Sequence, residues 1–420
     1  MSPTTRREFL GRAAALAAGA VVGGLAAPSA AASAPDPSPV SGTSRLVSVA
    51  AKDMLRDGAY APEAVHRAFA AGLTELTGKS TLPEAWASFV KPEDVVGIKI
   101  NAIGAPKISS SFASIRETIA GLKSAGVRDE NIIVWDRTDR EVARAGLSLN
   151  KSGPGVRVRG TSTESEAIVP WVEGYDRSAY VSFEDGTLKK FRELVKRDFT
   201  RTGSHRDIFN SVAWLWMLAR QGNEKAKVYG PELQRLYMDY SDREGIKKIA
   251  DEVAGMFDGL TIPDEDKSFF STIVTRDITK LVNIGVLKHN EDSGVTWAAK
   301  NIALGVTTNK VRFHIDYCAK AIPAILTHPC LRDKMVLHIG EAAKISVVSV
   351  AGAQIATDNR IFFSRDPVAM DRIGLDILED KREALGLESI RAISTHVAAC
   401  AAAGLGTDDP AKIDWRKLSV

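Results

Sequence analysis

The chain has 420 residues, of which 45% are hydrophobic and 25% are charged. This is the composition of a globular protein, and it excludes a disordered chain, a collagen-like fibre and a small disulfide scaffold. The formal net charge of +3, from 55 basic and 52 acidic residues, is too balanced to indicate a nucleic acid as the main partner.

The first 32 residues have the pattern of an export signal. Arg6 and Arg7 precede an Ala-, Gly- and Val-rich run at 13–27, and small residues follow the run. The arginine pair makes this segment resemble a twin-arginine (Tat) signal. The apolar run is shorter than the ~20 residues that span a membrane. We therefore expect a signal at 1–32 that is read by the Tat translocon and cleaved after Ala32. The mature protein is expected to be periplasmic or extracellular, without a stable membrane span.

A Pro-, Ser- and Gly-rich linker at 33–44 leads into alternating strand and helix patterns. Residues 95–100 are predicted to be a buried strand, 114–123 a helix and 131–135 a second strand. Strand, helix and strand in this order form a βαβ unit, whose strands pair in parallel. We therefore predict an α/β domain over 45–420, with a mainly parallel sheet flanked by helices.

The second half of the chain interrupts this pattern and then resumes it. Apolar residues repeat at helical spacing from 171 to 262, which predicts a helical insertion. Strand patterns return at 278–287 and 334–339, and 387–403 is predicted to be the final helix.

Several sequence blocks resemble a single family. The blocks are DVVGIKIN at 94–101, IVWDRTDRE at 133–141, VLKH at 286–289, GVT at 294–296, KN at 300–301 and SRDPVAMD at 364–371. In this order they are similar to the blocks of the "domain of unknown function 362" family, over about 90–410. The resemblance implies no particular activity. Some relatives carry ferredoxin-like cysteine clusters, but the three cysteines of this chain cannot supply a four-thiolate iron–sulfur cluster.

Candidate site residues follow the predicted strands. In open α/β sheets ligands bind beyond the carboxyl ends of the strands, which points to the loops at 101–107 and 136–141. We predict Lys288, His289 and Asp136 as catalytic residues. The candidate substrate-binding residues are Asn101, Arg137, Lys300 and Asn301. Histidine titrates near neutrality and lysine or arginine holds an anion, so this set favours proton transfer on an anionic ligand. The alternative is a solvated loop in which the histidine caps local backbone.

Two histidine–cysteine pairs form a second candidate group. His314 and Cys318 would share one face of a helix, and His328 and Cys330 would project to one side of an extended segment. Together they offer two nitrogen and two sulfur ligands for zinc or copper. Because a disulfide persists outside the cytoplasm, a Cys318–Cys330 bridge is an equal competitor. The third interpretation is that these residues are ordinary core and loop positions.

Acidic residues form a third candidate group. Its members are Asp136, Asp139, Asp358, Asp366 and Asp371. Carboxylates from separate strand ends can bind a divalent cation or serve as acid and base. Asp366 is followed by a proline, however, and this pair is also typical of a helix start.

The sequence lacks a G-x-G-x-x-G turn, a phosphate-binding P-loop, a G-x-S-x-G elbow and an H-E-x-x-H helix. Nicotinamide, nucleotide and serine-hydrolase functions therefore have no support. We predict an exported enzyme that acts on a small anionic substrate, with metal-dependent or redox chemistry left open and a divalent or transition metal as the candidate cofactor. The alternative is an extracytoplasmic protein that binds a small ligand without catalysis.

Overall fold

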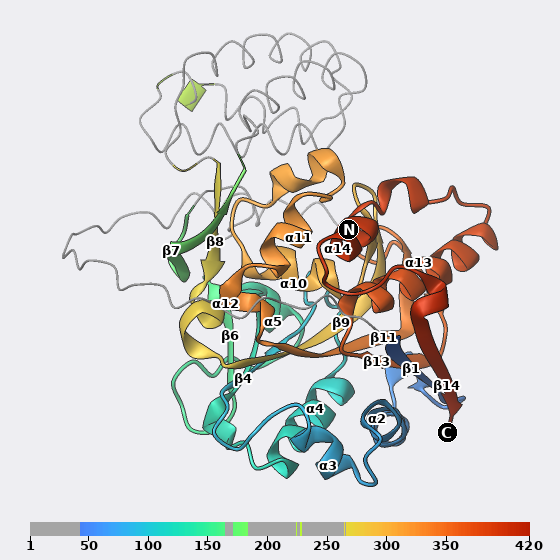
Figure 1. Ribbon diagram of the computed structural model, residues 1–420. Helices are drawn as coiled ribbons and strands as arrows, with labels where there is room; N and C mark the ends of the chain where they lie inside the picture. The colour runs from blue at the N-terminus through green and yellow to red at the C-terminus, as the bar shows by residue number, and fades with distance from the viewer. Residues whose placement is uncertain (1–42, 164–170, 184–223, 225–226, 229–263, 265) are drawn as a thin grey trace. The chain divides into compact units, whose positions relative to one another are not determined.

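The computed structural model describes residues 43–163, 171–183, 224, 227–228, 264 and 266–420, and these residues form an α/β fold (Figure 1). A ten-stranded sheet runs in the order β14-β1-β13-β11-β9-β4-β5-β6, with β10 paired to β9 and β12 paired to β11. Its strands are β1 (Ser44–Ala50), β4 (Val96–Lys99), β5 (Ile132–Thr138), β6 (Arg157–Ser162), β9 (Lys280–Asn290), β10 (Gly294–Thr296), β11 (Met335–Val348), β12 (Gln354–Thr357), β13 (Arg360–Ser364) and β14 (Ile413–Ser419). Two small antiparallel pairs join β2 (Leu55–Arg56) to β3 (Ala59–Tyr60) and β7 (Tyr175–Ser182) to β8 (Lys267–Ser271).

The sheet is mainly parallel. The neighbours β11, β9, β4, β5 and β6 are all paired in parallel, and β14 is parallel to β1. Strand β13 is antiparallel to both β1 and β11, so every other strand on the path runs in one direction. The predicted α/β fold with a mainly parallel sheet is confirmed. Because parallel strands end at one edge, the carboxyl ends of β4, β5 and β9 lie together.

Helices cover both faces of the sheet (Figure 1). The α-helices are α2 (Pro62–Thr77), α3 (Leu82–Ala87), α4 (Phe112–Ser124), α5 (Asp139–Arg144), α10 (Ala299–Val306), α11 (Ala321–Leu326), α12 (Pro329–Arg332), α13 (Pro367–Glu383) and α14 (His396–Ala402). Helices α2, α3 and α4 pack on one face, where Phe69 and Trp86 are fully buried. Helices α10, α11, α13 and α14 pack on the other face around Trp297, which is also fully buried. Burial on both faces explains why the central strands read as nearly continuous Val and Ile runs.

The predicted βαβ unit forms as β4, α4 and β5. Ser111 begins α4 because its side chain accepts a hydrogen bond from the backbone N–H of Ser114, a standard N-cap contact. The charged segment after the second strand was predicted to be a loop, but Asp136, Arg137 and Thr138 continue β5. The chain then turns directly into α5 at Asp139, with Thr138 as the N-cap.

Two predicted elements differ from the structure. The final helix predicted at 387–403 is helical only at α14 and in a 3₁₀ turn at Arg391–Ile393, and the C-terminal segment is strand β14. The segment 171–262 was predicted to be helical, but it begins with strand β7, which pairs with β8. The rest of the insertion, apart from residues 224 and 227–228, lies outside the described residues, as do the predicted signal at 1–32 and the linker up to 42. Among the described helices, none has the length and apolar character needed to cross a membrane.

Candidate active site

A buried ion pair lies at the carboxyl ends of β4 and β5. The Nζ of Lys99 is 2.6 Å from Oδ1 of Asp136, and the two side chains are 1% and 4% exposed. Lys99 also donates to the backbone oxygen of Ile100 at 2.6 Å. Removing two charges from water is costly, so a buried pair needs further hydrogen bonds to be tolerated.

Asp136 has those further contacts. Its Oδ2 accepts the backbone N–H of Ala102 at 2.7 Å, and its Oδ1 accepts the backbone N–H of Arg137 at 2.8 Å. Burial alone would raise the pKa of the carboxyl, but Lys99, Arg137 and these bonds outweigh it and lower the pKa. Asp136 is therefore a fixed negative charge whose two oxygens are occupied by protein donors.

Lys288 lies beside this pair and is a second buried lysine at the carboxyl ends of the strands. Its side chain is fully buried, and its Nζ donates to Oδ1 of Asn101 at 2.5 Å and to the backbone oxygen of Ile108 at 3.4 Å. Burial lowers the pKa of Lys288 to about 7; Asp136 opposes this shift, while Lys99 and Arg137 add to it. A lysine with this pKa carries a neutral amine in about half of the molecules at neutral pH.

Asn101 connects Lys288 to helix α10. Its Nδ2 donates to Oδ1 of Asn301 at 2.8 Å, and its backbone N–H donates to Oγ of Ser110 at 2.8 Å. The Ser110 hydroxyl in turn donates to the backbone oxygen of Ile284 on β9 at 2.7 Å. The loop between β4 and α4 is thus tied to β9, the strand that carries Lys288.

A buried carboxylate fixes the other end of the same loop. Glu341 on β11 accepts the backbone N–H of Ser111 at 2.9 Å and the hydroxyl of Ser114 at 2.6 Å. Burial raises the pKa of Glu341, while the serine contacts oppose the shift. These contacts place Glu341 at the N-terminus of α4, where the helix dipole favours a negative charge.

Arg137 is the site residue with access to solvent. Its guanidinium is paired with Glu141 on α5, and the two side chains are 17% and 9% exposed. The pair spans one helical turn and uses two guanidinium nitrogens, one of them Nε at 3.0 Å from Oε2. Such a fork restrains Arg137 at the rim of the edge.

The predicted pair Lys288 and His289 does not act as a pair. Neighbouring residues of a strand project to opposite faces, and the two side chains have different partners. Nδ1 of His289 accepts the backbone N–H of Ser349 at 3.3 Å. Burial, with Arg382 and Lys300 nearby, lowers the pKa of His289 to about 4. His289 is therefore neutral at pH 7 and has one ring nitrogen occupied.

Lys300 and Asn301 are also separated, because they occupy adjacent positions on α10. Asn301 contacts Asn101, whereas the Nζ of Lys300 donates to the hydroxyl of Ser293. The structure thus brings together Asn101, Asp136, Lys288 and Asn301, with Arg137 at the rim, and places His289 and Lys300 elsewhere.

The predicted histidine–cysteine metal site does not form. His314 lies in a 3₁₀ segment, Val311–Asp316, which ends before Cys318, so the two do not share an α-helix face. His328 is the N-cap of α12 and not part of an extended segment, because Pro329 begins the helix. His328 and Cys330 are in contact, with Nδ1 3.1 Å from Sγ. Across the described residues, no group of three or more His, Cys, Asp or Glu side chains is arranged to hold a metal ion.

The predicted Cys318–Cys330 disulfide is not formed either. Burial raises the pKa of Cys330 to about 12, with the nearby Asp176 adding to the shift and Lys334 opposing it. The thiol of Cys330 is therefore protonated beside a neutral histidine, and the pair is not an activated nucleophile.

The other predicted carboxylates have local partners. Asp366 caps α13, accepting the backbone N–H groups of Val368 and Ala369. Asp371 accepts the backbone N–H groups of Ala298 and Ala299 at the start of α10. Asp139 pairs with Lys151, and Asp358 pairs with Arg360. None of these four carboxylates contacts Asp136 through a described hydrogen bond or ion pair.

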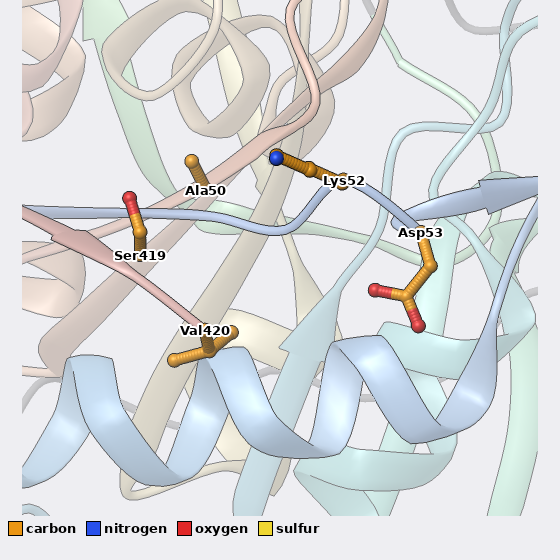
Figure 2. A pocket seen from close by; sticks show the side chains of 5 residues that line it. All are labelled: Ala50, Lys52, Asp53, Ser419 and Val420. Carbon is orange, nitrogen blue, oxygen red and sulfur yellow. The ribbon is translucent and has the colours of Figure 1, made fainter.

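A surface hollow of about 360 Å³ lies elsewhere on the same sheet (Figure 2). It is formed where β1 and β14 end, and it is lined by Ala50, Lys52, Asp53, Ser419 and Val420. Strands β13 and β11 separate β1 from β9 in the sheet order, so the hollow does not belong to the Lys288 site.

Two residues of the site were absent from the predicted set. Lys99 and Asn283 each stand inside an apolar strand pattern, and each is buried. Asn283 lies on β9 and its Oδ1 accepts from Nδ2 of Asn301 at 2.7 Å. A charged or amide residue within an otherwise apolar buried strand is the signal that identifies both, because such groups are buried only with a partner.

The sequence profile described as "Domain of unknown function (DUF362)" matches residues 236–376. This match supports the family resemblance and includes β9, α10 and β11 in full and most of the residues of α13. A crystal structure of a protein from Thermotoga maritima, solved by a structural genomics consortium, is similar with 9% identity and a TM-score of 0.33. That similarity covers 79% of this chain, and this chain spans 61% of the Thermotoga protein. No curated protein matches the sequence.

Proposed function

We propose that this chain is an exported enzyme that acts on a small anionic substrate, with Lys288 as the group that accepts a proton. The observation that supports this proposal is the buried Lys288 amine at the carboxyl edge of the sheet, with a pKa of about 7. A base is most effective when its pKa lies near the working pH, and a buried lysine is one of the side chains that proteins adjust in this way.

The charges around Lys288 favour an anion as the bound species. Lys99 is paired with Asp136, and Arg137 is paired with Glu141. Lys288 forms no ion pair with any described residue, so its ammonium form is a buried cation without a directly bound carboxylate. An anionic substrate, or the anion left when Lys288 removes a proton, would supply the missing counter-charge.

The remaining groups of the site have supporting roles in this scheme. Oδ1 of Asn101 and the backbone oxygen of Ile108 accept hydrogen bonds from the ammonium that forms when Lys288 takes a proton. The fixed charge of Asp136 stabilises that ammonium electrostatically. Arg137, at the rim, is the residue placed to meet an approaching anion. We transfer the proton-transfer role expected for His289 to Lys288, because His289 has other partners and a low pKa.

A substrate screen tests this function. The purified protein is incubated with small carboxylates and phosphate esters, and proton NMR follows both binding and product formation. Lys288→Met should abolish turnover while leaving the folded spectrum intact, and Lys52→Met, on the exposed hollow, should retain full turnover. Saturable binding of an unchanged ligand, with no product from any compound, would favour the non-catalytic binding protein. Turnover that survives in Lys288→Met would refute the assigned base.

The export proposal rests on the N-terminal sequence alone. A double change of Arg6 and Arg7 to lysine should leave the protein in the cytoplasmic fraction, because the Tat translocon reads the arginine pair. Export of this variant at the wild-type level would exclude the Tat route.

A further inference from the structure

A chain of three buried asparagine side chains continues the contacts of Lys288 into the protein. Nδ2 of Asn101 donates to Asn301 at 2.8 Å, and Nδ2 of Asn301 donates to Asn283 at 2.7 Å. Their side chains come from the loop after β4, from α10 and from β9. Asn101 and Asn301 are 5% and 6% exposed, and Asn283 is fully buried.

The hydrogen bonds between these three asparagine side chains all run in one direction, away from Lys288. A lysine ammonium has three donors and no lone pair, so it requires the oxygen of Asn101 and not its nitrogen. Once Oδ1 of Asn101 faces Lys288, Nδ2 must face away, and Asn301 must present its own oxygen to accept it. Asn301 then donates onward to Oδ1 of Asn283. Every amide in the chain therefore has the orientation that an ammonium at Lys288 demands.

A neutral Lys288 lacks this requirement. The neutral amine keeps two N–H donors and gains one lone pair, so it can donate to Oδ1 of Asn101 or accept from its Nδ2, and the second contact would reverse Asn101 and the two amides behind it. The end of the chain permits both directions, because Nδ2 of Asn283 has no hydrogen-bond partner among the described residues. The charge of Lys288 and the orientation of the amides are consequently linked.

Resting on the proposed function, we infer that Asn301 is a positioning residue, which keeps the oxygen of Asn101 on Lys288 and so stabilises the ammonium form of the base. Asn301 reaches Lys288 only through Asn101, and it contributes no atom to the proton transfer itself. With Asn301 present, the Asn101 side chain is held in one orientation; without it, the Asn101 amide is able to turn. Hydrogen bonds to charged groups are stronger than those between neutral groups, so loss of this orientation should shift the titration midpoint by about one pH unit.

The test measures the ionisation of Lys288 directly and without substrate. Lysine is labelled with ¹³C at Cε, the Lys288 signal is assigned by its absence in Lys288→Arg, and its shift is followed from about pH 5 to about pH 12, beyond the ordinary lysine pKa. In Asn301→Leu the midpoint should fall by about one unit, because Asn101 loses the acceptor that fixes it. In Asn301→Asp the midpoint should not fall, since a carboxylate offers only acceptors and still requires Nδ2 of Asn101 to face it.

The Lys288 midpoint should fall in Asn301→Leu but not in Asn301→Asp, and this difference separates positioning from general loss of structure. Thr118→Val removes a buried hydroxyl that donates to Ser114 in α4, and it should reduce stability without moving the Lys288 midpoint. An unchanged midpoint in Asn301→Leu, or an equal fall in the Leu and Asp variants, would overturn the positioning role. A wild-type midpoint near 10.5 would instead refute the proposed function, so the two failures are distinguishable.

Discussion

Lys99 and Asp136 form a buried ion pair that joins the ends of two neighbouring parallel strands, with 2.6 Å between Nζ and Oδ1. Lys99 belongs to β4 and Asp136 to β5. The same carboxylate accepts the backbone N–H of Ala102, the third residue of the loop that follows β4 and contacts Lys288. The pair therefore supports the loop as well as joining the two strands.

The losses of stability caused by changing Lys99 and Asp136 should not be additive, because the two charges compensate one another. Asp136→Ala leaves Lys99 as a buried cation without its carboxylate, and the free energy of unfolding should fall by about 3–5 kcal/mol. The double variant Lys99→Met with Asp136→Ala should lose clearly less than the sum of the two single changes, because no uncompensated charge remains. Urea denaturation of the four proteins gives the coupling. Additive losses would mean that the pair does not interact in solution.

The two strands of the βαβ unit could be predicted from the sequence, because burial on both faces of a sheet selects Val and Ile. The segments at 95–100 and 131–135 are apolar without alternation, which is the pattern of an interior parallel strand. The edge that carries the site follows from this pattern, since parallel strands end together. This is why Asn101 and Asp136 could be placed near one another from the sequence.

The contacts within the edge were not predictable in the same way. Lys288 and His289 are adjacent in sequence, but strand alternation gives them different surroundings. Asn283 reaches the site from the middle of β9, through a partner on α10 that the sequence does not reveal. Similarly, the helix face assumed for His314 and Cys318 is absent, because a 3₁₀ segment ends between them and Tyr317 has a left-handed backbone.

The charge of Lys288 should make stability depend on pH in the alkaline range. Its pKa is about 7 in the folded protein, against an ordinary value near 10.5 in the unfolded chain. Between these values unfolding takes up a proton, so the wild type should gain stability as the pH rises from 7 towards 10. The gain should approach about 1.4 kcal/mol per pH unit relative to Lys288→Met, which has no group to titrate at this position. Thermal melts of both proteins across this range measure the difference.

A flat difference between the two proteins would show that Lys288 keeps an ordinary pKa. A difference that grows in the opposite direction, with the wild type losing stability at high pH, would show that a counter-charge raises its pKa. Either result would remove the support for Lys288 as a base near neutral pH.

His338 should be replaceable by an apolar residue without loss of stability. It is fully buried on β11, opposite Asn283 in the parallel register with β9. Neither ring nitrogen has a hydrogen-bond partner among the described residues, and burial lowers its pKa to about 3. His338→Leu removes two unpaired polar atoms at similar volume, so its free energy of unfolding at pH 8 should equal or exceed that of the wild type.

The same histidine should contribute to acid unfolding. The unfolded chain protonates His338 near pH 6.5, whereas the folded protein resists until about pH 3, so its contribution to stability is lost as the pH falls between these values. Below pH 6.5 the wild type should therefore lose stability faster than His338→Leu, by up to about 1.4 kcal/mol per pH unit. Parallel slopes for the two proteins would indicate that the ring is solvated or hydrogen-bonded by water in the folded state.

Asp366 should be worth more than an ordinary helix cap, because it joins three segments. Its Oδ1 accepts the backbone N–H groups of Val368 and Ala369 at 2.8 and 2.9 Å, which caps α13. Its Oδ2 accepts the backbone N–H of Thr407 at 3.0 Å and the hydroxyl of Ser44, at the start of β1. A cap alone contributes about 1 kcal/mol, so Asp366→Ala, which also frees the other two donors, should lose about 2–3 kcal/mol.

The substitution Asp366→Asn distinguishes capping of α13 from the contact with Thr407. Asp366→Asn keeps an oxygen for the helix but presents an N–H₂ group to the backbone N–H of Thr407, which can only donate, whereas the hydroxyl of Ser44 can turn to accept from it. Its loss of unfolding free energy, measured by urea denaturation, should therefore lie between those of the wild type and Asp366→Ala. If asparagine performs as well as aspartate, the contact with the backbone N–H of Thr407 contributes nothing to stability.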